Sequence, residues 1–176
     1  GHLYTFGSGC GGKLGDGNTD DHSVGIPTLV DPKYFDGPIT TVSCGGLHTA
    51  VIAAGKLYTF GNGRYGKLGD GNTDIHAVAV PTLVDPKYFD GHVTTVSCGA
   101  CHTAVIAAGQ LYTFGNGRYG KLGNGNTTDH SVGIPTLVDP KYFDGPVATV
   151  SCGDLHTVVI AAGQLYTFGN GCYGKL

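Results

Sequence analysis

Residues 39–63 read ITTVSCGGLHTAVIAAGKLYTFGNG, and this stretch decides the fold. It holds three short runs of β-favouring side chains, at 39–44, 48–53 and 56–60, and each run is closed by a glycine-containing turn. Alternating β-branched and aromatic residues between such turns are typical of short strands. The stretch therefore predicts three consecutive antiparallel strands joined as a tight meander.

A fourth strand is expected at 78–80, beyond an irregular stretch at 66–73. Pro81 follows directly, and proline cannot donate to a ladder of backbone hydrogen bonds, so this strand should lie at the edge of its sheet. Four short antiparallel strands are the signature of a β-propeller blade. A chain of such blades is thus an all-β protein, with an open β-solenoid or spiral as the alternative.

The same pattern returns every 54 residues without an insertion or deletion. The expected units are 1–54, 55–108 and 109–162, with a partial unit at 163–176, and the second unit matches 42 of 54 positions in each of its neighbours. A strict period of this length indicates units that bury their apolar faces on one another. The whole chain is therefore expected to be one repeat array.

Composition supports a turn-rich β-protein and excludes several classes of partner. The chain has 32 glycines, no Met or Trp, and a net charge of −3. Glycine supplies the turn conformations that short strands need, and no basic stripe of the kind that binds phosphate backbones is present. No apolar run approaches the ~18 residues of a membrane helix. Nucleic acid and membrane are therefore not expected as partners.

The recurring core of the repeat is VSCGxxHT followed by GxLYTFGNGxYGKLGxGNT, seen for example at Cys98–Thr103 and Leu111–Asn126. This pattern resembles the repeat of the regulator of chromosome condensation family. The chain departs from it where that family often has Trp and Gln. It carries Phe6, Phe60, Phe114 and Phe168 in the first column, and Lys13, Lys67, Lys121 and Lys175 in the second.

The resemblance implies a propeller, usually of seven blades. Seven units of this length need ~378 residues, and three blades fall below the ~4-blade minimum of a closed propeller. We therefore expect a partial propeller completed by more of the same polypeptide, by a second chain, or by an open spiral in which one copy caps the next.

Three motifs suggest chemistry but have simpler interpretations. Cys98-Gly-Ala-Cys101-His102 has haem-attachment spacing, yet Cys101 replaces a leucine of the other units. The Cys–His pairs of each unit are equal copies without an orienting third group. The loops beginning at Asp16 and Asp70 imitate a calcium loop, but Asx turns explain them. No catalytic residue, metal or cofactor is therefore predicted.

Two further sites are predicted from single columns. Cys10 and Cys172 share a loop column that carries Arg64 and Arg118 in the interior units, which suggests a disulfide within a closed assembly or between chains. Asn126-Thr-Thr is the single N-glycosylation sequon. It permits secretion without indicating it, so the localisation stays open.

Aromatic and basic side chains recur on the loops, where they can anchor a protein partner or fold back onto the blade. The candidate contact residues are Tyr34, Phe35, Tyr88, Phe89, Tyr142, Phe143, Arg64, Tyr65, Arg118 and Tyr119.

The function expected from this pattern is a non-enzymatic repeat scaffold for protein–protein interaction, acting alone, as a homo-oligomer or within a longer repeat chain. The alternative is a self-assembling structural subunit of a periodic or filamentous assembly, inside or outside the cell, since near-identical surfaces favour head-to-tail contacts. Exchange-factor activity on a small GTPase and enzyme inhibition, both known in the family, are less favoured because they depend on diverged loops.

Overall fold

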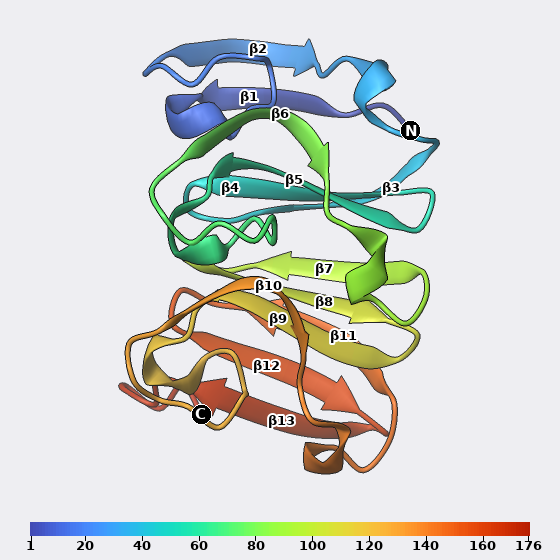
Figure 1. Cartoon of the computed structure of the whole chain (residues 1–176), viewed down its shortest axis with the longest axis vertical. Helices are drawn as coiled ribbons and strands as arrows, with labels where there is room; N and C mark the ends of the chain where they lie inside the picture. The colour runs from blue at the N-terminus through green and yellow to red at the C-terminus, as the bar shows by residue number, and fades with distance from the viewer.

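The computed structural model describes residues 1–176, whose thirteen strands form four small sheets that follow one another along the long axis of the molecule (Figure 1). The strands are β1 (Tyr4–Ser8), β2 (Ser23–Leu29), β3 (Ile39–Cys44), β4 (His48–Ala53), β5 (Lys56–Asn62), β6 (Ala77–Leu83), β7 (Val93–Cys98), β8 (His102–Ala107), β9 (Gln110–Asn116), β10 (Ser131–Leu137), β11 (Val147–Cys152), β12 (His156–Ala161) and β13 (Gln164–Gly169). Six three-residue 3₁₀ turns connect them: η1 (Cys10–Gly12), η2 (Pro32–Tyr34), η3 (Arg64–Gly66), η4 (Pro86–Tyr88), η5 (Arg118–Gly120) and η6 (Pro140–Tyr142).

Two of the sheets are complete four-stranded blades, with strand orders β3-β4-β5-β6 and β7-β8-β9-β10. All their strand pairs are antiparallel. The predicted blade is confirmed, including the edge position of β6, the strand that holds Pro81. At the ends, β1-β2 supplies only a third and fourth strand, and β11-β12-β13 supplies only the first three. The blades form an open arc that does not close into a ring (Figure 1).

Gly61 shows why glycine is needed within a strand of each blade. The register of β5 against β6 shifts between Thr59 and Gly61, and Gly61 has a φ of +112°. A Cβ atom at this position would lie 2.6 Å from the carbonyl oxygen of Leu47. A side chain here would therefore clash with backbone, and glycine lets β5 bend toward the loop that follows.

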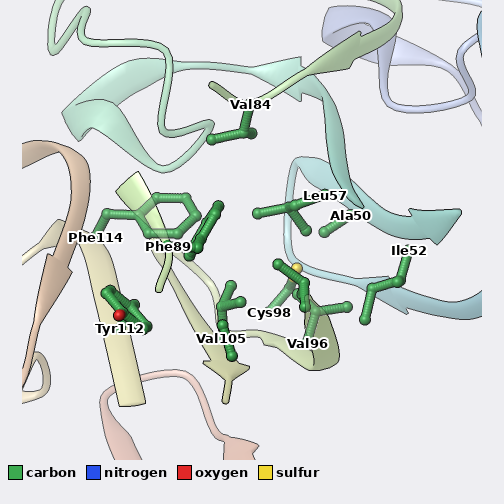
Figure 2. Close-up of a cluster of buried hydrophobic side chains, with 12 residues drawn as sticks. Ala50, Ile52, Leu57, Val84, Phe89, Val96, Cys98, Val105, Tyr112 and Phe114 are labelled. Carbon is green, nitrogen blue, oxygen red and sulfur yellow. The ribbon is translucent and has the colours of Figure 1, made fainter. Parts of the chain in front are cut away.

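The hydrophobic core lies between blades (Figure 2). Ala50, Ile52 and Leu57 of one blade pack against side chains that include Val96 and Cys98 of the next. Equivalent clusters join the second blade to β11–β13, and join β1-β2 to the first blade. Each blade is thus stabilised by its neighbours, as expected of a repeat array. None of the helical turns is long or apolar enough to cross a membrane.

Candidate interaction surface

The loops gather on two opposite sides of the arc (Figure 1). One side, called here the Arg–Tyr rim, carries η1, η3 and η5, which follow the third strand of each blade. The other side, the Lys–Tyr rim, carries η2, η4 and η6, which follow the fourth strand. Because the repeat has a fixed length, equivalent side chains recur along each rim.

On the Arg–Tyr rim, arginine and tyrosine pair in two successive units. The guanidinium of Arg64 lies over the ring of Tyr65 at 4.6 Å from its centroid, and that of Arg118 lies over Tyr119 at 4.7 Å. Both tyrosines have left-handed backbone, with φ of +69° and +67°, whereas the first unit has Gly11 at this position. A left-handed non-glycine residue costs about 1–2 kcal/mol. Two units therefore retain a tyrosine where glycine fits more easily.

Buried lysines shape these loops. Lys67 is 2% exposed, and its Nζ donates to the side-chain oxygen of Asn62 at 2.6 Å and to the carbonyl of Arg64 at 3.2 Å. Burial disfavours the charged ammonium and so lowers the pKa of Lys67. None of the ion pairs in the structure supplies a carboxylate to oppose this effect. Lys121 makes the same contacts with Asn116 and Arg118.

The sequence indicated these lysines only as departures from the family pattern. Their place between Gly and Leu gave no signal of burial, because Lys13 and Lys175 stand in the same place without being buried.

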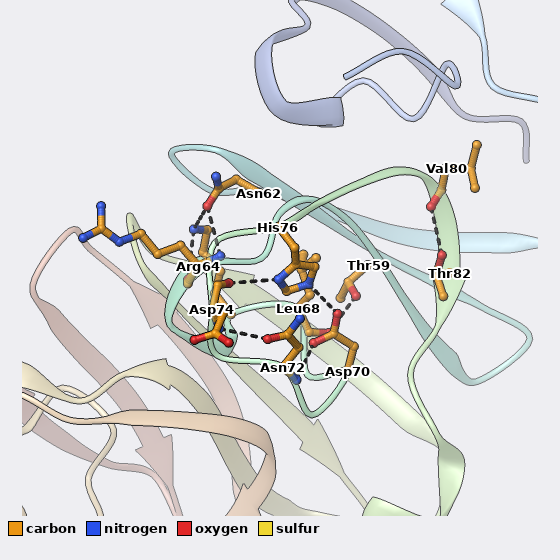
Figure 3. A network of polar contacts seen from close by, with 11 residues as sticks. Thr59, Asn62, Arg64, Leu68, Asp70, Asn72, Asp74, His76, Val80 and Thr82 are labelled. Carbon is orange, nitrogen blue, oxygen red and sulfur yellow. Dashed lines mark hydrogen bonds and ion pairs between the residues drawn. The ribbon is translucent and has the colours of Figure 1, made fainter. Parts of the chain in front are cut away.

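The loop after η3 is ordered by its own side chains (Figure 3). Asp70 accepts a hydrogen bond from the backbone of Asn72, and Asn72 accepts one from that of Asp74. The second carboxylate oxygen of Asp70 lies 2.7 Å from Nε2 of His76, whose Nδ1 lies 3.0 Å from the carbonyl of Asp74. The Asp70 carboxylate is therefore engaged in an Asx turn and a histidine contact, and the Asn72 side chain makes the next Asx turn.

These contacts set the protonation of His76. Burial lowers the pKa of His76, but the hydrogen bonds to the Asp74 carbonyl and the Asp70 carboxylate outweigh burial and leave the pKa raised. The third unit differs, because Asn124 stands opposite His130 there at 3.0 Å. One unit of the chain thus lacks the charge that faces the histidine in the other two.

Asp70→Asn should lower the pKa of His76, because it removes the carboxylate that stabilises the imidazolium. The measurement is the pH dependence of the His76 ring signals by NMR. His22, which keeps its Asp16 partner at 2.7 Å, is the internal control and should titrate as before. An unchanged His76 titration in the variant would show that the ion pair does not set its protonation.

The Lys–Tyr rim directs its phenylalanines inward. Phe35 packs edge-to-face on Tyr58 with ring centroids 5.2 Å apart, and the next two units repeat the pair with Phe89 and Phe143. The adjacent tyrosines stay nearer the surface, each under a lysine, as Lys33 lies 5.1 Å from the ring centroid of Tyr34. Equivalent contacts recur at Tyr88 and Tyr142. Within this candidate contact loop, the tyrosine and lysine are therefore the accessible part.

Inside the arc, the cysteines and histidines shared by all units lie between blades, whereas Cys44 at the first end is exposed. Nε2 of His48 is 2.8 Å from Oγ1 of Thr103, and that oxygen donates to the carbonyl of Lys67, so the histidine donates to the threonine. Burial, reinforced by the Lys67 charge, lowers the pKa of His48 to about 3. Burial also raises the pKa of the Cys98 thiol to about 12. Burial likewise lowers the pKa of His102 to about 3, so the Cys98–His102 pair of the second unit is a protonated thiol and a neutral imidazole, which is poorly suited to nucleophilic chemistry.

The remaining predicted site residues lie on exposed loops. Cys10 and Cys172 are exposed and unpaired at the two ends of the arc. Asn126 is exposed, and its side-chain oxygen accepts hydrogen bonds from the backbone and hydroxyl of Thr128.

A family model for the regulator of chromosome condensation (RCC1) repeat matches residues 1–52, 54–106 and 108–160. The chain belongs to the RCC1-repeat family. Curated relatives include the X-linked retinitis pigmentosa GTPase regulator of dog, 41% identical over 73% of this chain and 13% of the relative. The human E3 ubiquitin-protein ligase HERC2 is 34% identical over 97% of this chain and 4% of the ligase. The Ultraviolet-B receptor UVR8 of Arabidopsis thaliana is 36% identical over 99% of this chain and 38% of the receptor.

Solved structures support the same fold. Prp20p of Saccharomyces cerevisiae matches with a TM-score of 0.81 at 20% identity, over 96% of this chain and 41% of Prp20p. Human WBSCR16 matches with a TM-score of 0.76 at 22% identity, over 94% of this chain and 42% of WBSCR16. This RCC1-repeat chain thus spans less than half the length of these relatives, and its sheets are RCC1 propeller blades.

Proposed function

We propose that this RCC1-repeat chain is a non-enzymatic scaffold that binds protein partners through its rims. The observation that carries the proposal is the stacked Arg–Tyr pair, placed on the same rim in two successive units with its tyrosine in left-handed backbone. Strained positions persist where another demand outweighs stability, and arginine and tyrosine are enriched where proteins contact one another. Two equal sites one repeat apart suit a partner that engages both.

The names of the relatives agree with a role in protein interaction. One is called a GTPase regulator, and the Prp20p structure is described with its binding properties to Gsp1p and histones. Those partners belong to those proteins, and this chain's own partner is to be defined by experiment.

Replacing both Tyr65 and Tyr119 by glycine should abolish partner binding without loss of stability. Glycine relieves the left-handed strain, worth about 1 kcal/mol per site, and removes a cation–π contact of about 0.5–1 kcal/mol. The free energy of unfolding should therefore stay within about 1 kcal/mol of the parent. Gly11, at the same position with a φ of +72°, provides the precedent.

The measurement is quantitative cross-linking mass spectrometry of partners bound by the parent and by the variant. Tyr142→Ala, on the Lys–Tyr rim, is the matched control and should leave contacts made by the Arg–Tyr rim unchanged. Retention of every partner by the Tyr65→Gly/Tyr119→Gly variant would rule out the Arg–Tyr rim as the binding surface.

A self-assembling structural subunit is the second candidate, favoured by the apolar surfaces that both ends of the arc expose. The disulfide between Cys10 and Cys172 is kept here as a proposed link between chains. Mass analysis under non-reducing conditions should detect a dimer held by these two residues, whereas free thiols at both positions would remove the disulfide.

A further inference from the structure

The two ends of the arc expose side chains that the interior blades bury. On the first blade, Val42 of β3 is 50% exposed, whereas its equivalent Val96 is 6% exposed. On the last blade, Leu165 of β13 is 67% exposed, whereas its equivalent Leu57 is 1% exposed. Exposed apolar side chains in equivalent positions mark a contact surface that lacks its partner within this chain.

The two end surfaces are the two halves of the interface found between interior blades. In that interface, Ile52 and Leu57 of one blade lie in the same cluster as Val96 and Cys98 of the next. The last blade offers Ile160 of β12 in the role of Ile52, and the first blade offers Val42 and Cys44 in the second role. A second copy of this chain therefore carries the surface that the last blade needs.

A polar ladder across the blades is also unfinished. His48 contacts Thr103 at 2.8 Å, and His102 contacts Thr157 at 2.9 Å, each 55 residues on. His156 is the next member, but the chain has no threonine 55 residues beyond it. Thr49 of a second copy is the equivalent residue, and its hydroxyl already donates to the Lys13 carbonyl as Thr103 does to Lys67.

We propose that the 176-residue polypeptide associates head to tail with a second copy, whose β1-β2 hairpin and first blade continue the arc beyond β12. The interface repeats the one between interior blades and buries Val42 of the incoming copy against Ile160. Such a contact is heterologous, since the two copies use different faces.

Continuing the arc requires an exchange of strands, because residues 163–176 and residues 1–14 of the second copy occupy the same positions of the repeat. The two segments differ at three positions only: residues 1–14 have His2, Ser8 and Gly11 where residues 163–176 have Gln164, Asn170 and Tyr173. β13 pairs only with β12, whereas β1 is held by β2. The incoming β1 therefore replaces β13 with nearly the same hydrogen bonds to β12. The new contact between the last blade and the first blade of the incoming copy then supplies the net free energy of association.

This inference concerns the ends of the arc; it rests on and deepens the self-assembly candidate proposed above and is independent of the rim function. The variants that test it leave Arg64, Tyr65, Arg118 and Tyr119 untouched, so either proposal can fail without the other.

The test uses two charged variants of the full chain, Val42→Asp at one end and Ile160→Asp at the other. Each buries an unpaired carboxylate in the proposed interface, so each should weaken association at least about 100-fold. Ile75→Asp is the matched control, because Ile75 is 73% exposed on a loop where the other units have Asp21 and Asp129. Light scattering after size exclusion, over a range of concentrations, gives the number of chains per particle.

Parent and Ile75→Asp chains should associate as concentration rises, while each end variant alone stays a single chain. An equimolar mixture of the two end variants should form a particle of two chains and stop there, because only one intact pair of faces remains. A monomeric parent at every concentration would overturn the proposal and leave further repeats of a longer polypeptide to cover the ends. Association that survives both variants, or a mixture that stays monomeric, would also overturn it.

Circular dichroism should show that both end variants keep the β-spectrum of the parent, since Val42 and Ile160 are solvent-accessible in the single chain. Val42→Lys and Ile160→Lys serve in their place if an aspartate variant unfolds, and the mixing result is expected to be the same.

Discussion

Phe114→Ala should lower the free energy of unfolding by about 3–5 kcal/mol, the usual cost of deleting a buried aromatic side chain. Phe114 is fully buried between the first and second blades, and a Cβ placed on Gly69 would lie 2.9 Å from its ring. The residue thus fills the space that glycine leaves open on the neighbouring loop. Chemical denaturation of the parent and the variant measures the difference.

Phe6→Ala is the control for this prediction, because Phe6 holds the same position of the repeat but is 62% exposed on β1. Its loss should cost less than about 1 kcal/mol. Equal costs at Phe6 and Phe114 would contradict the conclusion that contacts between blades stabilise the array.

Acidification should destabilise the chain through His48 and His102, whose pKa values burial lowers to about 3. Histidine in the unfolded chain has a pKa of 6.5, so below this pH the unfolded state binds protons while the buried imidazoles of the folded state stay neutral. Stability is therefore present in full above pH 6.5 and is lost as the pH falls toward 3. The shift of roughly 3.5 pH units corresponds to about 4–5 kcal/mol for each histidine.

Denaturation curves between pH 7 and pH 3 measure this loss. His102→Gln keeps a hydrogen-bonding side chain that does not titrate in this range, so its stability should fall less steeply with acid than that of the parent. Asp154→Asn, at an exposed position outside the histidine contacts, is the surface control and should keep the parent's steep loss below pH 6. If the His102→Gln variant were as acid-sensitive as the parent, these buried imidazoles would not govern acid unfolding.

The regular part of this fold could be predicted from sequence because each strand is marked locally. Glycine turns bound the stretches 39–44 and 48–53, and Pro81 marks the edge strand. The 54-residue period then places every other strand. These signals come from backbone propensity and apolar alternation, which act over a few residues.

The environment of Lys67 and His48 could not be predicted in the same way, because it depends on the neighbouring blade. A lysine in a glycine-rich loop is expected in solvent, yet Lys67 is buried by the packing of the next sheet. His48 similarly gains its partner from Thr103, 55 residues away. The inward packing of Phe35, Phe89 and Phe143 agrees with the alternative that these loops fold back onto the blade, and their role in partner contact stays a prediction.

The reactivity of the three repeat-column cysteines tests most directly the conclusion that the chain is an open arc of mutually covering blades. Cys44, Cys98 and Cys152 occupy one position of the repeat, yet Cys44 is exposed and Cys98 is buried. At concentrations where the chain is a single copy, we expect a thiol reagent to label Cys44 rapidly and Cys98 only on unfolding, as read by peptide mass spectrometry. Equal protection of Cys44 and Cys98, or rapid labelling of Cys98, would contradict this arrangement.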